Sequence, residues 1–316
     1  MQNKRVHPEK LFHIPKEKDG FFRRPSQKNR ILRNISILAL SVCLALFFYA
    51  HFQEQSSRTA AATEYQKLQE EKSVSSAASF PDLTDLAPLA KTGDTNRTEA
   101  ADETAETSDS PSILPIYQAL YEQNPDLIGW LRIPDTIIDY PVMQTPLDET
   151  YYLSRDFEKR DSTSGCLILD TASQAGIGTA AQDYRNGIAP STNLIIHGHT
   201  MKSGEMFGRL KKYADETYGK AHRLLYFDSL YEQREYELIA VFYSQVYRST
   251  DPVFKYYDFF RASTQEEFDN WYQNIKALSL YDTGVSAQFG DEFLTLSCCS
   301  YHMADGRFVV VARRVT

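Results

Sequence analysis

Short runs of β-branched and aromatic residues, separated by turn-forming residues, recur along the last 200 or so residues of the 316-residue chain. Such runs are typical of β-strands. We predict about eight strands, and this many strands in one domain favours a barrel or a sandwich. The predicted strands are residues 130–133, 137–142, 165–169, 193–197, 224–227, 236–242, 293–296 and 308–312.

Two segments of the same region have helical spacing. Residues 116–123 form a short amphipathic pattern that ends at Asn124-Pro125. Residues 264–277 open with Thr264 and carry Glu267 three positions later, which is the pattern of a capping box. The apolar face of this second helix consists of Phe268, Trp271, Tyr272 and Ile275.

Residues 35–52 form an apolar run of 18 residues without a formal charge. As a helix this run spans about 27 Å, enough to cross a bilayer. A cleaved signal peptide has a shorter apolar core followed at once by small residues, whereas Tyr49, Phe52 and Glu54 stand here. Small residues do occur at 59–62, which leaves cleavage open. We predict a retained, single-pass membrane anchor.

Charge is distributed unevenly along the chain. Residues 1–34 carry ten Lys or Arg and three acids, which predicts a cytoplasmic N-terminus and an extracellular C-terminal region at the plasma membrane. Residues 73–112 carry two basic and eight acidic residues and few large apolar ones, which predicts a flexible spacer. Residues 64–72 can continue the anchor as a short polar helix. The predicted organisation is a basic tail (1–34), an anchor (35–52), an acidic spacer (53–112) and a strand-rich domain (113–316).

The formal net charge of the chain is −8. A nucleic-acid-binding protein carries a basic face or stripe that contacts phosphates. The predicted domain has no such stripe in its sequence, so we predict no nucleic-acid partner.

The predicted extracellular region contains three of the four cysteines, Cys166, Cys298 and Cys299. Disulfides are common in such a space, but adjacent Cα atoms lie only about 3.8 Å apart and neighbouring side chains in a strand point to opposite faces. A disulfide between Cys298 and Cys299 is therefore strained. An unpaired thiol at the end of a strand is a candidate nucleophile if a base lies near it. Cys43 lies in the apolar run, where packing is the simplest interpretation.

Four histidines fall in the predicted domain: His197, His199, His222 and His302. His199 follows a predicted strand that ends at Gly198, and strand ends often carry catalytic side chains. Taken alone, a histidine in this place is more often structural or simply exposed.

Arg307 opens the last predicted strand, after the loop that follows Cys299. If the two strands pair as a hairpin, Arg307 and Cys299 flank the same loop. A permanent cation there favours a thiolate and stabilises the oxyanion that forms when a thiolate attacks a carbonyl. Without that pairing, Arg307 is an ordinary surface charge.

In these three places together the chain resembles the sortases, the surface transpeptidases of Gram-positive bacteria. Residues 295–299 (Thr-Leu-Ser-Cys-Cys) are similar to the family's Thr-Leu-x-Thr-Cys signature, which assigns the nucleophile to Cys299. Residues 196–199 resemble the family's strand that ends in Gly-His, which assigns the catalytic base or acid to His199. Arg307, eight residues after the cysteine, matches the family's essential arginine. We also predict that Ser297 contacts the substrate.

The resemblance covers residues 115–316 and points to the class B branch. Residues 124–131, 138–144, 151–153 and 193–208 and the helix-bearing insertion before the cysteine read like that class. It implies a mainly-β fold with helices, a closed barrel of about eight strands preceded by a transmembrane helix. The chain departs from the pattern in two places. Cys298 replaces the usual Thr and adds a second thiol that could serve redox inactivation, and His197 replaces Tyr or an apolar residue and is the alternative histidine.

By this resemblance, Cys299 attacks a Thr carbonyl in a C-terminal sorting motif of a secreted protein and forms a thioacyl enzyme. An amine of peptidoglycan then resolves it, and no metal or organic cofactor takes part. The sorting motif and the client proteins stay open, as does a pilin lysine as acceptor.

Two other functions remain as alternatives. His197 and His199 share a strand face and, with a cysteine, could form the zinc site of a hydrolase. The second alternative is a catalytically silent, membrane-tethered scaffold.

Overall fold

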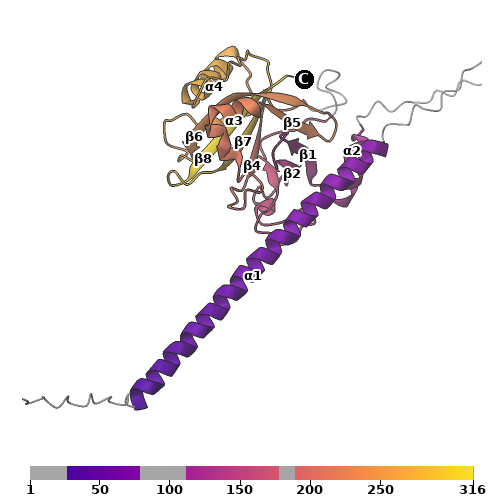
Figure 1. The fold of residues 1–316 in the computed structure, drawn as a ribbon. Coiled ribbons are helices and arrows are strands. Elements are labelled where there is room, and N and C mark those ends of the chain that lie inside the picture. Colours follow the sequence, from indigo (N-terminus) through magenta and orange to yellow (C-terminus); the bar gives the residue numbers. More distant parts are fainter. Residues whose placement is uncertain (1–26, 79–111, 178–188, 316) are drawn as a thin grey trace, which may run out of the picture. The chain divides into compact units, whose positions relative to one another are not determined.

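The structure, a computed structural model, describes residues 27–78, 112–177 and 189–315 (Figure 1). The chain divides into two compact units, residues 1–55 and 56–316, and all the described strands lie in the second. The strands are β1 (Leu127–Arg132), β2 (Asp139–Met143), β3 (Leu167–Leu169), β4 (Asn193–Gly198), β5 (Leu224–Ser229), β6 (Glu235–Gln245), β7 (Phe293–Cys299) and β8 (Gly306–Arg314).

The eight strands form one closed sheet in the order β1-β2-β3-β4-β7-β8-β6-β5, with β5 pairing back to β1. The β2–β3 and β4–β7 pairs are parallel, and the other pairs are antiparallel. Every predicted strand is present, with ends that shift by a few residues. The mainly-β class and the eight strands are thus confirmed for the described part of the chain.

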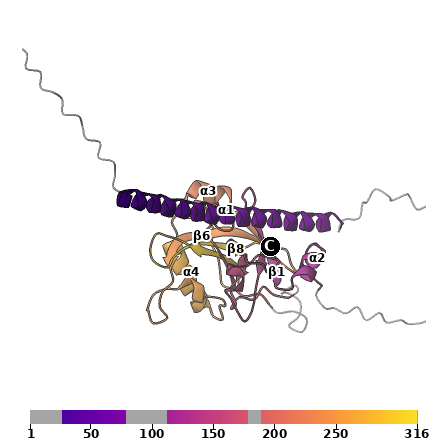
Figure 2. The same cartoon turned by 90° about the horizontal axis from the view of Figure 1, so that it is seen from below.

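Successive side chains along a strand point to opposite faces of the sheet, and in this barrel both faces carry an apolar core. Residues at even positions of β7 and β8, such as Leu296 and Val310, belong to the core inside the barrel. Residues at odd positions, such as Phe293 and Val309, belong to a second core outside it. Helix α4 (Gln265–Leu278) covers this outer core and lies beside β6 (Figure 2). The outer face of β7 is therefore buried near its start and leads toward a half-buried Cys299 at its end.

Helix α4 confirms the predicted capping box. The Thr264 hydroxyl accepts a hydrogen bond from the backbone N–H of Glu267, and the Glu267 carboxylate accepts one from the backbone N–H of Thr264. Phe268, Trp271 and Ile275 are buried on the predicted face. The other helices of the barrel domain are α2 (Pro115–Gln123), which confirms the first predicted helix, and α3 (Glu216–Ala221), which was not predicted.

Helix α1 (Gln27–Ala78) differs from the predicted organisation. It includes Asn34–Gln53, the one segment in the described residues that is long and apolar enough to cross a membrane, a test that a signal sequence also passes. It then continues through residues 54–78, which include the polar helix that residues 64–72 were expected to allow and extend into the predicted spacer on both sides of it. The reason is an apolar stripe at Ala61, Tyr65 and Leu68, whose helical spacing places all three side chains against the barrel. The remaining predicted spacer residues (79–111) and most of the basic tail (1–26) lie outside the described residues.

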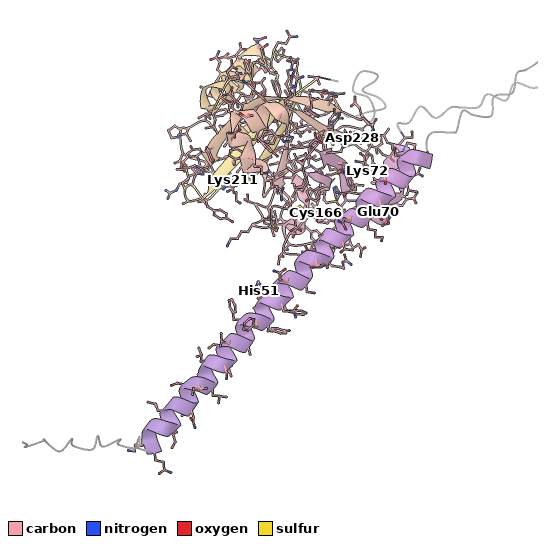
Figure 3. All side chains as sticks on the ribbon, in the orientation of Figure 1. His51, Glu70, Lys72, Cys166, Lys211 and Asp228 are labelled. Carbon is pink, nitrogen blue, oxygen red and sulfur yellow. The ribbon has the colours of Figure 1, made fainter. Side chains whose placement is uncertain are left out.

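Polar contacts fix residues 64–72 of α1 on the barrel. The Tyr65 hydroxyl donates to the Gly165 carbonyl at 2.5 Å, and Gln69 donates to the Asp139 carbonyl at 2.7 Å. The Lys72 ammonium lies 4.6 Å from the centre of the Trp130 ring. Figure 3 shows Lys72 and Cys166 at this seam between helix and barrel.

Candidate active site

Strand register brings the predicted site residues to one face of the barrel. Cys299 pairs with Arg307 across the antiparallel β7–β8 hairpin, and Gly198 pairs with Cys298 across the parallel β4–β7 ladder. Paired residues on neighbouring strands point to the same face. Extending the β4–β7 register by one residue places His199 beside Cys299. The three residues therefore lie at the ends of β4, β7 and β8, on the outer face.

The loop between Cys299 and Arg307 depends on a glycine. The backbone N–H of Ser300 donates to the Gly306 carbonyl at 2.8 Å and closes the hairpin. A Cβ on Gly306 would lie 2.3 Å from the Ser300 carbonyl oxygen, so no larger residue fits there. This close approach holds the ends of β7 and β8 side by side.

The two adjacent cysteines lie in different surroundings. Cys298 points into the barrel core and is 2% exposed, and burial raises the pKa of its thiol to about 11. It is therefore a neutral thiol at physiological pH. Cys299 points to the opposite face and is half-buried. This difference makes Cys299 the accessible thiol of the pair.

His199 is held by a backbone carbonyl. Its Nε2 lies 2.8 Å from the carbonyl oxygen of Leu153. A carbonyl only accepts hydrogen bonds, so Nε2 carries a proton and Nδ1 is the basic nitrogen of the neutral ring. Next to it, the Thr200 hydroxyl donates to the carbonyl of Cys299 at 2.6 Å and ties the end of β4 to the end of β7.

The hydrogen bonds of Arg307 go to backbone carbonyls. Its Nη1 donates to the carbonyl oxygens of Asp305 and Gly306 at 3.3 and 3.1 Å. Within the part of the chain that the structure describes, no carboxylate lies at ion-pair distance from Arg307. Its charge is thus available to an anionic group at the Cys299 face.

Ser297 lies beneath the surface. It is 1% exposed, and its hydroxyl is 2.7 Å from the hydroxyl of Tyr256, whose pKa burial raises. Its predicted contact with substrate stays a prediction. The Tyr256 contact was not predicted, because nothing in the sequence connects positions 256 and 297.

His197 lies on the same outer face as His199 but has a different partner. Its Nε2 is 3.1 Å from Oδ2 of Asp170, the residue that follows β3. Burial acts to raise the pKa of Asp170, but the hydrogen bonds with His197 and with the backbone N–H of Ala172 outweigh it, and the pKa is lowered. Burial and the Asp170 charge raise the pKa of the neighbouring Glu149. Together the three side chains form a donor set that can hold a metal ion.

The carboxylates of this set were missed at the sequence level. Asp170 directly follows a predicted strand, as His199 does, and that position was the available signal. Glu149 carries no comparable signal, because the fold brings its loop to β3 and β4.

The chain is similar to known class B sortases. It is 32% identical to sortase B of Listeria monocytogenes over 204 residues, which cover 62% of this chain and 73% of that protein. It is 24% identical to sortase B of Staphylococcus aureus over 204 residues, which cover 64% and 75%. A comparison with protein-family models gives no match.

Solved structures give the same result. A structure of sortase B from B. anthracis in complex with AAEK1 has 32% sequence identity and a TM-score of 0.52, and the match covers 66% of this chain and 88% of that one. A Staphylococcus aureus sortase B–substrate complex has 19% identity and a TM-score of 0.60, covering 83% and 99%. The second likeness concerns the fold alone.

The barrel and these relatives define a cysteine transpeptidase. More narrowly, the chain belongs to the sortase B family, as the sequence resemblance predicted.

Proposed function

We propose that the protein cleaves a C-terminal sorting motif of secreted proteins through a thioacyl intermediate on Cys299 and transfers them to an amine of peptidoglycan. The observation that carries the proposal is the strand register, which aligns Cys299 with Arg307 and, extended by one residue, with His199. Membership of the sortase B family supplies the reaction class.

In the first half of the reaction, Nδ1 of His199 takes the proton of the Cys299 thiol, and the sulfur forms a bond to the carbonyl carbon of the motif's Thr. The C–N bond to the next residue then breaks, and His199 gives that proton from Nδ1 to the departing amine. In the second half, the acceptor amine attacks the thioester, loses a proton to His199 and releases the Cys299 thiolate. The Leu153 carbonyl supports this role, since it leaves Nδ1 of His199 as the nitrogen that exchanges protons.

Arg307 stabilises the negative charge that develops on the attacked carbonyl oxygen. Preorganised donors are most effective when no other anion neutralises them. The absence of a carboxylate partner for Arg307 among the described residues supports this role.

The membrane is the proposed site of action. Asn34–Gln53 serves as a single-pass anchor, and the basic residues before it keep the N-terminus in the cytoplasm of a Gram-positive cell. The barrel domain is then extracellular, where secreted proteins and the cell wall are accessible to Cys299.

The test uses the full chain in detergent, because residues 61–68 of α1 contribute to the packing of the barrel domain. Quenched fluorescent peptides with LPxTG-like and NPxTN-like motifs are incubated with wild type and with Cys299→Ala, His199→Ala, Cys298→Ala and His197→Ala variants. We expect cleavage of one motif class, its loss in the first two variants and its survival in the last two. A peptidoglycan amine and a pilin-type Lys peptide then identify the acceptor.

Two results would count against the proposal. The first is no cleavage of any peptide together with no labelling of Cys299 by a thiol-directed vinyl sulfone, which favours a catalytically silent scaffold. The second is cleavage that persists in Cys299→Ala.

A further inference from the structure

A cluster of three potential metal ligands lies beside the proposed catalytic face. Glu149 comes from the loop before the 3-10 turn η2 (Tyr151–Leu153), Asp170 directly follows β3, and His197 lies in β4. One donor atom from each lies within 4.8 Å of the other two. Three segments that are distant in sequence thus place their donors around one point.

The separation of the donors suits coordination. Metal–ligand bonds to histidine nitrogen and carboxylate oxygen are about 2.0–2.2 Å long, so neighbouring ligands lie about 2.8–3.6 Å apart in octahedral or tetrahedral geometry. Nε2 of His197 and Oδ2 of Asp170 are joined by a hydrogen bond of 3.1 Å, and an ion that binds both atoms would replace the proton between them. The other Asp170 oxygen accepts a hydrogen bond from the backbone N–H of Ala172 at 2.9 Å, which holds the carboxylate in this orientation.

The cluster places two carboxylates beside a single imidazole. Across residues 112–177 and 189–315 neither carboxylate has a Lys or Arg at ion-pair distance, and burial and the Asp170 charge raise the pKa of Glu149. At the seam between α1 and the barrel, by contrast, the buried carboxylate of Glu64 has a cationic partner, Arg160, at 2.7 Å. A bound cation would supply the missing positive charge.

We propose that Glu149, Asp170 and His197 bind a divalent first-row transition metal ion, with Zn²⁺ as the first ion to test. An imidazole nitrogen in the donor set favours such an ion over Ca²⁺ or Mg²⁺, which prefer oxygen ligands alone. Three protein ligands leave at least one coordination position for water. The site differs from the zinc hydrolase alternative, since it contains neither His199 nor a cysteine.

The ion would also restrict the orientation of the proposed catalytic histidine, His199. Glu149 lies two residues before η2, and the last residue of η2, Leu153, accepts the hydrogen bond from His199. An ion that holds Glu149 restricts the segment that orients the His199 ring. This second step rests on the proposed role of His199, whereas binding of the ion does not.

Binding is measured without any peptide substrate, on the untagged full chain in detergent, by calorimetric titration with ZnCl₂. We expect Glu149→Gln and His197→Gln each to lose one zinc equivalent that the wild type binds. Two matched controls should retain it: Glu70→Gln, an exposed carboxylate on α1, and His222→Gln, whose ring faces the Pro134 carbonyl. Thermal melting of each variant confirms that it is folded.

Three outcomes would overturn the metal site: no zinc binding by the wild type, equal stoichiometry in Glu149→Gln and His197→Gln, or tighter binding of CaCl₂ than of ZnCl₂. Hydrogen exchange tests the link to His199. We expect zinc to slow exchange of residues 149–153 in the wild type and not in Glu149→Gln. Unchanged exchange overturns that link and leaves the metal site standing. Zinc binding by a protein that cleaves no peptide contradicts the proposed function and not the site.

Discussion

Two patches of the barrel domain each contain one cysteine and one arginine, yet their partners differ. At the ends of β7 and β8, Cys299 is half-buried and Arg307 has no carboxylate partner among the described residues. At the seam between α1 and the barrel, Cys166 is fully buried and Arg160 contacts three carboxylates. The residue types alone do not distinguish the two patches.

The two patches differ in whether nearby carboxylates neutralise the charge of the arginine. Arg160 lies 2.7 Å from Glu64, 2.8 Å from Asp156 and 2.8 Å from Glu158, so its charge is already matched. These ion pairs join α1 to the barrel, and they leave little of the positive electrostatic field of Arg160 for a ligand. Among the described residues Arg307 is bonded to backbone carbonyls alone, so its charge is available to an incoming anion. We therefore expect mutations in one patch to change activity and mutations in the other to change stability.

The largest effect is expected for the two cysteines. Cys299→Ala should lower peptide cleavage at least about 10³-fold, because the covalent intermediate cannot form. Cys166→Ala should keep the cleavage rate and lower stability by about 1 kcal/mol through the loss of a buried sulfur. Cleavage kinetics and urea unfolding measure the two effects. A large loss of cleavage in a folded Cys166→Ala protein would remove the distinction between the patches.

Substitution of one arginine should lower kcat, and substitution of the other should lower stability. Arg307→Ala should reduce kcat by about 10²–10³-fold and leave the melting temperature unchanged, because it removes oxyanion stabilisation. Arg160→Ala should keep kcat and cost about 1–3 kcal/mol, because the largely buried carboxylates of Glu64 and Asp156 lose their partner. Steady-state kinetics and thermal melting of both variants decide. Equal melting losses would show that Arg307 is also structural.

The two patches also differ in how far the sequence predicts them. Arg307 and Cys299 flank one hairpin loop, and a local hairpin register follows from the spacing of apolar residues and the turn. The eight strands and the capping box of α4 were likewise predictable, because each depends on residues close in sequence. His199 needed the family resemblance, since its place beside Cys299 depends on a parallel pairing across about 100 residues.

The packing of α1 against the barrel at the seam could not be predicted from composition. Residues 53–78 were assigned to a polar spacer with a short polar helix at 64–72, and only the positions of Ala61, Tyr65 and Leu68 show the apolar stripe. The surface that receives this stripe is formed by β2 and the loop before β3, roughly 75 to 100 residues further along. No periodicity within one segment identifies such a partner.

Glu64 should give the seam between α1 and the barrel a pH-dependent contribution to stability. Burial and the neighbouring Asp156 raise the pKa of Glu64 from 4.5 to about 7, against the opposing effect of Arg160. The folded protein then holds this proton more tightly than the unfolded chain does. The contribution to stability is complete below pH 4.5 and is lost as the pH rises to about 7. Glu64→Gln should therefore remove part of the fall in melting temperature across this window.

The control for this effect is Glu70→Gln, an exposed carboxylate on the same helix, which should keep the wild-type pH dependence. Thermal melting at several pH values measures all three proteins. Parallel curves for wild type and Glu64→Gln would contradict the expected role of Glu64.

The smallest effect is expected from Tyr65→Phe. The change removes the hydroxyl that donates to the Gly165 carbonyl at 2.5 Å and keeps the ring, which packs edge-on against Tyr140 at 5.1 Å. We expect a cost of about 1 kcal/mol, the usual net contribution of one hydrogen bond. Tyr121→Phe, on α2, is the matched control and should have no effect.

Labelling of thiols in the native protein shows whether Tyr65→Phe destabilises the seam alone or the whole domain. Cys166, which is 0% exposed, should react with a thiol reagent about fivefold faster in Tyr65→Phe than in the wild type, since 1 kcal/mol raises the population of the open seam by that factor. Labelling of the half-buried Cys299 should not change. If both cysteines react faster by the same factor, the hydrogen bond stabilises the whole domain rather than the seam, and the two patches are not independent.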